Sequence, residues 1–183
     1  MNKMRYENGE ARRAGRTVQE IMASFSRFFL PYLNCEDSNV LDVGAGNGRF
    51  SFALSTFAKK VIAIDSHDTQ NEIYKRKNID FLNVKFEEFA INIKFDLCFM
   101  WGVWYYLFTR EDQDEMFDRL MSMLSESGVI VIIDDVQSKI QTTDFIEKNK
   151  DKVEILAIDD SGSSGKFCLV VKKLGENSEA QPI

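Results

Sequence analysis

Three glycines, Gly44, Gly46 and Gly48, follow a short apolar run that carries one acid, Asp42. This spacing predicts a strand, a tight turn and the start of a helix. Glycine tolerates positive φ and has no side chain, so the backbone of such a turn can contact a ligand closely. The first turn of the helix offers N–H groups and a positive dipole end to an anionic group. Asp42, two residues before the first glycine, argues against a diphosphate and favours a ligand that carries a positive charge.

The elements that must position this turn alternate between strand and helix. Hydrophobic periodicity predicts helices over 17–33, 50–57, 69–77, 111–124 and 142–149, and strands over 39–43, 60–64, 81–86, 95–101, 129–133, 153–158 and 167–172. A loop rich in Asp, Ser and Gly separates the last two strands, which predicts an antiparallel hairpin. Five alternations of strand and helix imply an α/β fold with a doubly wound parallel sheet.

Ligands of doubly wound sheets bind at the carboxyl ends of the strands. This rule selects five segments, which are 42–48, 65–68, 86–88, 101–106 and 134–135. We therefore expect the chemistry of the protein among the residues of these segments.

The composition is that of an ordinary globular protein, with 183 residues of which 44% are apolar and 28% are charged. We expect one domain over 1–174, a helical N-terminal segment over 1–33 that can act as a lid, and a disordered tail over 175–183. The sequence contains no bilayer-spanning apolar run and no secretory signal, so we expect a cytoplasmic protein with no membrane partner. The three cysteines include no Cys-x-x-Cys pair, which predicts neither a disulfide framework nor a metal site.

The net charge of −6 argues against a nucleic-acid partner, because such proteins usually carry a basic footprint. The best candidate for a footprint is the cluster of Arg12, Arg13 and Arg16. We interpret this cluster as the solvated face of an N-terminal helix, with a binding role as the alternative.

Four segments, in order, resemble those of class I S-adenosylmethionine-dependent methyltransferases. They are the glycine turn at 40–48, the strand that ends in an acid at 61–65, the fourth-strand pattern at 95–99, and the helix end and fifth strand at 124–132. The resemblance covers about 39–174. It implies a Rossmann-like, seven-stranded, mostly parallel sheet with a C-terminal antiparallel strand pair. It also implies S-adenosylmethionine as the cofactor and S-adenosylhomocysteine as its product.

The resemblance assigns parts of the cofactor to residues of this chain. The turn residues expected at its amino-acid end are Asp42, Gly44, Ala45, Gly46, Asn47 and Gly48. Asp65 is expected to accept hydrogen bonds from both ribose hydroxyls, and Ser66 to border the adenine. Phe86 and Glu87 are also expected at the adenine. Many family members have an Asp just before the position of Phe86, where this chain has Lys85, so backbone groups or Glu87 would take its place.

Three residues beyond the cofactor segments complete the expected site. Trp101 stands at the end of a strand and is expected to touch the cofactor, because aromatic rings stack on bases and exclude water. Methyl transfer needs a base only where the acceptor must lose a proton. Asp134, with Tyr105 as a weaker candidate, is placed for that role, and a helix cap is the alternative for Asp134.

The expected function is methyl transfer from S-adenosylmethionine to a small molecule with an aromatic or apolar part. The alternatives are a non-catalytic partner subunit with a methyltransferase fold, and an RNA or protein methyltransferase. A nicotinamide-dependent oxidoreductase is disfavoured, because Arg49 stands where its fingerprint needs a third glycine. Aminopropyl transfer is disfavoured, because the aromatic segment 101–106 offers few acids for a polyamine. The sequence leaves the acceptor, the methylated atom and the oligomeric state open.

Overall fold

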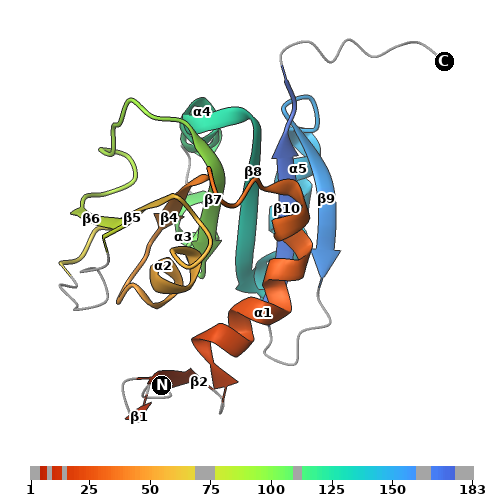
Figure 1. Ribbon diagram of the computed structural model, residues 1–183. Coiled ribbons are helices and arrows are strands. Elements are labelled where there is room, and N and C mark those ends of the chain that lie inside the picture. Colours follow the sequence, from red (N-terminus) through yellow and green to blue (C-terminus); the bar gives the residue numbers. More distant parts are fainter. Residues whose placement is uncertain are drawn as a thin grey trace.

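The computed structural model describes residues 5–7, 10–13, 16–68, 77–108, 113–159 and 166–175. A seven-stranded sheet in the order β6-β5-β4-β7-β8-β10-β9 forms its centre (Figure 1). The strands are β4 (Asn39–Val43), β5 (Lys60–Asp65), β6 (Ile79–Asn83), β7 (Phe95–Trp101), β8 (Leu124–Asp135), β9 (Val153–Asp159) and β10 (Lys166–Lys173). The strands from β6 to β8 pair in parallel, whereas β10 runs antiparallel to both β8 and β9. The predicted Rossmann-like sheet with a C-terminal antiparallel pair is confirmed.

Helices cover both faces of the sheet. One face carries α1 (Val18–Phe29), the short 3₁₀ helix η1 (Leu30–Tyr32) and α2 (Arg49–Leu54), which lie in front in Figure 1. The other face carries α3 (Trp104–Phe108), α4 (Gln113–Met123), the 3₁₀ helix η3 (Val136–Ser138) and α5 (Lys139–Lys148). Because both faces are covered, a central strand such as β7 can be apolar along most of its length.

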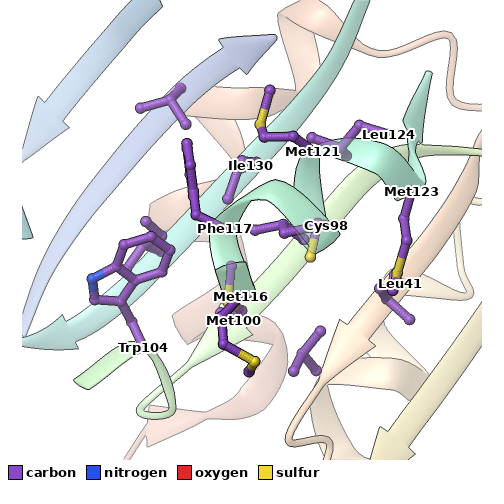
Figure 2. Close-up of a cluster of buried hydrophobic side chains, with 14 of the residues drawn as sticks. Leu41, Cys98, Met100, Trp104, Met116, Phe117, Met121, Met123, Leu124 and Ile130 are labelled. Carbon is purple, nitrogen blue, oxygen red and sulfur yellow. The ribbon is translucent and has the colours of Figure 1, made fainter. Parts of the chain in front are cut away.

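Alternate residues of the central strands enter two separate apolar cores. Cys98 and Met100 of β7 point to the core under α4, where Phe117 is fully buried (Figure 2). Phe99, between them, points to the opposite face and packs edge-on against Phe29 of α1, with ring centroids 6.5 Å apart. The alternation fixes the register of β7 and therefore the position of its carboxyl end.

For most elements the predicted bounds lie close to the observed bounds, and for β4 and β7 the two are identical. The third predicted strand, 81–86, is displaced, because β6 ends at Asn83 and the chain then turns. In that turn the amide of Phe89 donates to the carbonyl oxygen of Lys85 at 3.0 Å. The separate helix α3 was not predicted, because its aromatic residues were assigned only to the end of the preceding strand.

The N-terminal segment differs from the helix expected over 1–33. The described parts form a small antiparallel sheet of β1 (Arg5–Glu7), β2 (Glu10–Arg13) and β3 (Arg16–Thr17), and α1 begins only at Val18. The expected helix face with three arginines is therefore wrong, since those residues belong to β2 and β3. Glycines at positions 9 and 15 disfavour a helix there. The helix expected over 69–77 and the disordered tail expected over 175–183 fall almost wholly outside the described residues.

Candidate cofactor site

The glycine turn between β4 and α2 is built on a single carbonyl group of β5. The amides of Gly44 and Ala45 both donate to the carbonyl oxygen of Ile64, at 2.9 and 3.0 Å. Gly44 has a φ of +69°, and a Cβ at this position would lie 2.2 Å from Cγ1 of Val103. The backbone of the turn thus meets the loop after β7 so closely that Gly44 has no space for a side chain.

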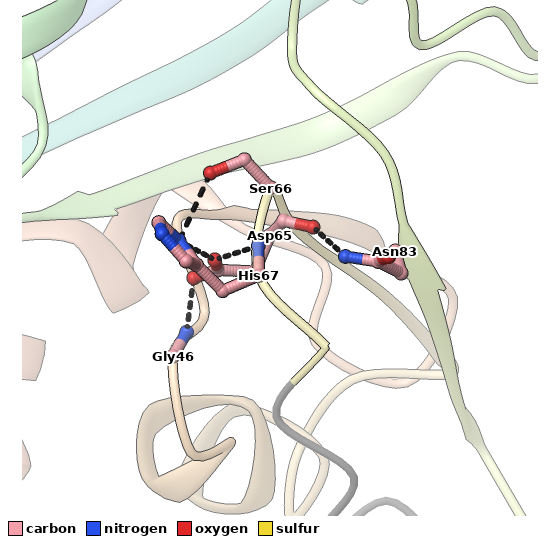
Figure 3. Close-up of polar contacts among 5 residues, drawn as sticks. All are labelled: Gly46, Asp65, Ser66, His67 and Asn83. Carbon is pink, nitrogen blue, oxygen red and sulfur yellow. Dashed lines mark hydrogen bonds and ion pairs between the residues drawn. The ribbon is translucent and has the colours of Figure 1, made fainter.

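The carboxylate of Asp65 lies at the same turn (Figure 3). Its Oδ2 accepts a hydrogen bond from the amide of Gly46 at 2.8 Å, and its Oδ1 accepts one from the amide of His67 at 2.9 Å. Nδ1 of His67 lies 3.4 Å from Oδ1 of Asp65 and 3.1 Å from the hydroxyl of Ser66. Asp65 therefore fixes the glycine turn and the loop after β5 to each other.

Asp42 lies beneath the turn. Its buried carboxylate accepts a hydrogen bond from the hydroxyl of Ser51, in α2, at 2.5 Å. Burial raises the pKa of Asp42 from 3.8 to about 7; the bond from Ser51 lowers this pKa, and the nearby charge of Asp65 raises it. The contact joins β4 to the first turns of α2, so Asp42 supports the glycine turn from inside the protein.

A cavity of about 440 Å³ opens at the carboxyl ends of the central strands. Its lining residues are Val43, Gly44, Ile64, Asp65, Ser66, His67, Val84, Lys85, Phe86, Glu87, Gly102, Val103 and Tyr106. Because β6 and β7 lie on opposite sides of β5 and β4, the segment 84–87 borders one end of the cavity and the segment 102–106 the other. The volume and the mixture of apolar walls with a few polar groups suit a small-molecule ligand.

Arg119 of α4 holds the wall of the cavity that Phe86 and Glu87 form. Its Nε donates to the carbonyl oxygen of Phe86 at 3.2 Å, and its Nη2 donates to the carbonyl oxygen of Phe89. Arg119 was not among the residues predicted from the sequence. A signal was present, because Arg119 lies three residues after the buried Met116, on the inward side of the helix. A cation on that side needs buried acceptors.

Trp101, which was expected to touch the cofactor, is absent from the cavity wall. Its ring stacks on Phe50 of α2 with centroids 4.3 Å apart, and it meets Phe25 of α1 edge-on at 5.5 Å. The alternation of side chains along β7 places Trp101 on the same face as Phe99, away from the cavity. Its indole Nε1 is buried and has no hydrogen-bond partner among the described residues.

Asp134 is buried and its carboxylate accepts two backbone hydrogen bonds. The amide of Tyr105, in the first turn of α3, donates to Oδ2 at 3.0 Å, and the amide of Asp135 donates to Oδ1 at 2.7 Å. The bond from Tyr105 ties the end of β8 to the beginning of α3. Of the two neighbouring tyrosines, Tyr106 lines the cavity and Tyr105 does not. Neither Asp134 nor Tyr105, the two residues predicted to act on the acceptor, lines the cavity.

The remaining predicted residues divide into two groups. Those that line the cavity are Gly44, Asp65, Ser66, Phe86 and Glu87. Those that form or support the turn without lining the cavity are Asp42, Ala45, Gly46, Asn47 and Gly48. In the described part of the chain, no group of three or more His, Cys, Asp and Glu side chains is placed to hold a metal ion. No helix described here combines the length and apolar character that a membrane span requires.

Comparison with known proteins agrees with this geometry. Residues 40–128 match the sequence model of a family described as "Methyltransferase domain". This part of the chain is therefore similar in sequence to methyltransferase domains. The matched range contains the glycine turn, Asp65, the wall at Phe86 and Glu87, and Arg119. It ends before Asp134, in β8.

A curated protein and many solved structures resemble this chain. A tRNA U34 carboxymethyltransferase from Campylobacter curvus is 31% identical over 119 residues, which cover 60% of this chain and 39% of the relative. The chain thus spans about two fifths of the length of the curated relative that it matches. The N-methyltransferase NodS from Bradyrhizobium japonicum WM9, in complex with S-adenosyl-L-homocysteine, superposes with a TM-score of 0.69 at 18% identity, over 85% of this chain and 86% of NodS.

A second solved structure is magnesium protoporphyrin IX methyltransferase from Synechocystis PCC 6803 with bound SAM. It superposes with a TM-score of 0.65 at 14% identity, over 85% of this chain and 79% of the other. At these identities the two structures show that this chain shares their fold.

Proposed function

We propose that this chain binds S-adenosylmethionine in the 440 Å³ cavity and transfers its methyl group to an acceptor at the cavity mouth. The observation that carries the proposal is the position of Asp65. Its carboxylate stands at the carboxyl end of β5, on the cavity wall, and is fixed to the glycine turn by the amide of Gly46. A carboxylate at this place in a doubly wound sheet is the group that receives ribose hydroxyls.

The residues present fit a nucleoside. Each oxygen of Asp65 accepts one backbone hydrogen bond, and a carboxylate oxygen has two lone pairs, so both can accept a further bond from a ribose diol. With the ribose at Asp65, the base lies toward Phe86 and Glu87, and the amino-acid end lies toward Gly44 and Gly102. The exposed Lys85 stands where the resemblance places an acid, so we assign recognition of the adenine amino group to Glu87 or to backbone groups of this segment.

When bound, the cofactor supplies an activated methyl carbon, so the part of the protein is to orient the reactants and exclude water. Gly44 and Val103 close the floor of the cavity through their direct contact. Asp134 holds the amide of Tyr105 and thereby positions the first turn of α3, which carries Tyr106 to the cavity wall. We therefore assign Asp134 to positioning and Tyr106 to contact with the acceptor.

Exposed apolar side chains favour an acceptor with an aromatic or apolar part. Tyr105 and Tyr106 are 46% and 68% exposed, and their rings meet edge-on with centroids 6.0 Å apart. Val136 and Ile140 are 41% and 71% exposed and follow the carboxyl end of β8, beside the loop after β7. Tyr106 also lines the cavity, so exposed apolar surface is present at its wall.

Isothermal titration with S-adenosylhomocysteine tests the proposal. We expect saturable binding by the wild type, and a loss of about tenfold or more in Asp65→Ala, because a hydrogen bond to a charged group contributes about 1.5–3 kcal/mol. Asp80→Ala is the matched control. Asp80 is an acid on the adjacent strand, paired with Lys60 at 2.7 Å and absent from the cavity wall, so this variant should bind like the wild type. Folded wild type that takes up no ligand would refute the proposal.

RNA is a second candidate acceptor, favoured by the printed name of the curated relative and by the N-terminal sheet. The register of β1, β2 and β3 sets Arg5 opposite Arg12, and Arg13 opposite Arg16. Arginine is a residue type that commonly contacts the phosphates of a nucleic acid. Filter binding with bulk tRNA tests the candidate. A wild type that binds at 50 mM salt, together with an Arg12→Ser/Arg13→Ser variant that does not, would support RNA over a small molecule.

A further inference from the structure

Lys166 is a buried lysine at the edge of the sheet where the cavity opens. It is the first residue of β10, lies opposite Asp135 in the register with β8, and is 6% exposed. Because β10 runs against β8, its first residue stands beside the carboxyl ends of the parallel strands. Burial of an ammonium group is costly unless its donors are satisfied, so this position calls for a partner.

The partner in the structure satisfies only part of this group. Nζ of Lys166 lies 2.8 Å from Oδ1 of Asp135, and no other hydrogen bond of this ammonium is present among the described residues. An ammonium has three N–H donors. The pair is also asymmetric, because the side chain of Asp135 is 66% exposed while that of Lys166 is 7% exposed. A pair that served only the sheet edge would leave its lysine in solvent, as the Lys152–Asp118 pair does with 37% of its lysine exposed.

Gly102 connects Lys166 to the cavity. Gly102 lines the cavity, and its φ of +68° turns the place of a missing side chain toward the lysine. A Cβ built on Gly102 would lie 4.0 Å from Nζ of Lys166, with no heavy atom nearer among those described. A ligand oxygen that rests against Gly102 therefore comes within hydrogen-bond reach of the donors of Lys166 that no described residue accepts.

We propose that the ammonium of Lys166 recognises a carboxylate bound against Gly102. The inference rests on the proposed function for the direction of the ligand, since the ribose at Asp65 leaves the opposite end of the cavity, at Gly44 and Gly102, for the anion. The carboxylate comes from the amino-acid end of the cofactor or from the acceptor. Both sources have the same chemistry, and the experiment separates them.

Titrations of two ligands into four proteins form the test. S-adenosylhomocysteine carries the amino-acid carboxylate, whereas 5′-methylthioadenosine has the same nucleoside and thioether without it. The proteins are wild type, Lys166→Met, Asp135→Asn and Lys152→Met. Asp135→Asn removes the same ion pair but keeps the buried ammonium, and Lys152→Met removes an ion-paired lysine at the other end of the sheet. Lys166→Gln replaces Lys166→Met if the latter is not folded by circular dichroism.

If the carboxylate belongs to the cofactor, Lys166→Met lowers the affinity for S-adenosylhomocysteine about tenfold or more. The affinity of this variant for methylthioadenosine stays within twofold of that of the wild type. Asp135→Asn and Lys152→Met bind both ligands as the wild type does. For an acceptor carboxylate, Lys166→Met keeps its affinity for S-adenosylhomocysteine. In that case benzoate, titrated into protein saturated with this ligand, binds wild type and Asp135→Asn but not Lys166→Met.

Equal losses in Lys166→Met and Asp135→Asn would overturn the inference, because the ion pair would then act on the fold alone. Unchanged binding of both S-adenosylhomocysteine and benzoate by Lys166→Met would also overturn it, and would leave the proposed function intact. Failure of the folded wild type to bind either nucleoside is a different result, which overturns the proposed function itself.

Discussion

The guanidinium group of Arg119 donates from Nε to the carbonyl oxygen of Phe86 at 3.2 Å, and the same group reaches the carbonyl oxygen of Phe89. One side chain from α4 thus closes the turn that follows β6. Through this turn the helix sets the position of Phe86 on the cavity wall, although Arg119 itself does not line the cavity.

Replacement of Arg119 by Met should therefore weaken the binding of a nucleoside without removing any atom from the cavity wall. Two buried carbonyl groups lose a charged donor, at about 1–3 kcal/mol, and the wall at Phe86 becomes mobile. We expect methylthioadenosine to bind several-fold more weakly to Arg119→Met, with partial recovery in Arg119→Lys. Arg27→Met is the control, because Arg27 is exposed on α1 and its partner Asp159 lies 4.0 Å away. Equal affinities of Arg119→Met and wild type for methylthioadenosine would contradict the assignment.

Asp42 should make the stability of the protein depend on pH. Its folded pKa of about 7 exceeds the unfolded value of 3.8, so the folded state binds the proton more tightly. This contribution to stability is complete below about pH 4 and is lost as the pH rises through 7. Relative to Asp42→Asn, which cannot ionise, wild type should lose on the order of 3 kcal/mol of unfolding free energy between pH 4 and pH 8. Urea denaturation across this range measures the difference, and parallel curves would rule out the raised pKa.

The two glycines of the turn offer a matched pair of substitutions. Gly46→Ala adds a methyl group where no atom lies within 4 Å, so only its φ of +55° is strained, at about 1–2 kcal/mol. Gly44→Ala has similar backbone strain and also places Cβ against Val103, which adds about 1–3 kcal/mol. In thermal unfolding the wild type should have the highest Tm, Gly46→Ala a lower one and Gly44→Ala the lowest. A Gly44→Ala protein as stable as Gly46→Ala would show that the loop after β7 yields easily.

We expect Trp101 to contribute to the stability of the fold and not to cofactor binding. Trp101→Phe keeps a ring against Phe50 and removes a buried N–H that has no partner in the described parts of the chain, so we expect a change in stability of about 1 kcal/mol or less. Trp101→Ala leaves a void and should cost about 3–5 kcal/mol. Calorimetric affinity for S-adenosylhomocysteine should be the same in wild type and Trp101→Phe. A marked loss of affinity in Trp101→Phe would instead indicate that Trp101 contacts the cofactor.

The thiols should differ in reactivity. Burial raises the pKa of Cys98 far above its usual 9, and that of Cys168 to about 12, so neither supplies a thiolate in the folded protein. Cys35 is partly exposed. We expect Ellman's reagent to modify one thiol of the native protein promptly and all three in denaturant. Prompt reaction in a Cys35→Ser variant would show that the sheet opens.

The strands were predictable because their apolar runs are continuous and end at acids or glycines. β4 and β7 are buried on both faces, which leaves few alternatives to their bounds. The cavity wall was predictable at Gly44 and Asp65, because strand order places the ends of β4 and β5 side by side. Side-chain direction was harder to predict. Whether Trp101 or Val103 faces the cavity depends on the phase of β7 and on the positive φ at Gly102, which sequence alone does not specify.

The polar contacts between residues that are far apart in the chain could not be predicted from the sequence either. Arg119 is separated from Phe86, and Lys166 from Gly102, by long stretches of chain, and only the packed structure brings them together. The arginines at 12, 13 and 16 were misplaced because periodicity says little about a short segment rich in charge. Asp134 was correctly located at a strand end, but its role depends on backbone amides that no sequence pattern marks.

The reversed direction of β10 has a consequence for how such a protein diversifies. β9 ends at Asp159 and β10 begins at Lys166, both at the edge of the sheet where the 440 Å³ cavity opens. Residues inserted between these two positions during evolution would lengthen the connection without breaking the hydrogen bonds between β9 and β10. The hairpin is thus a place where new acceptor preferences can arise by insertion while the inherited scaffold stays unchanged.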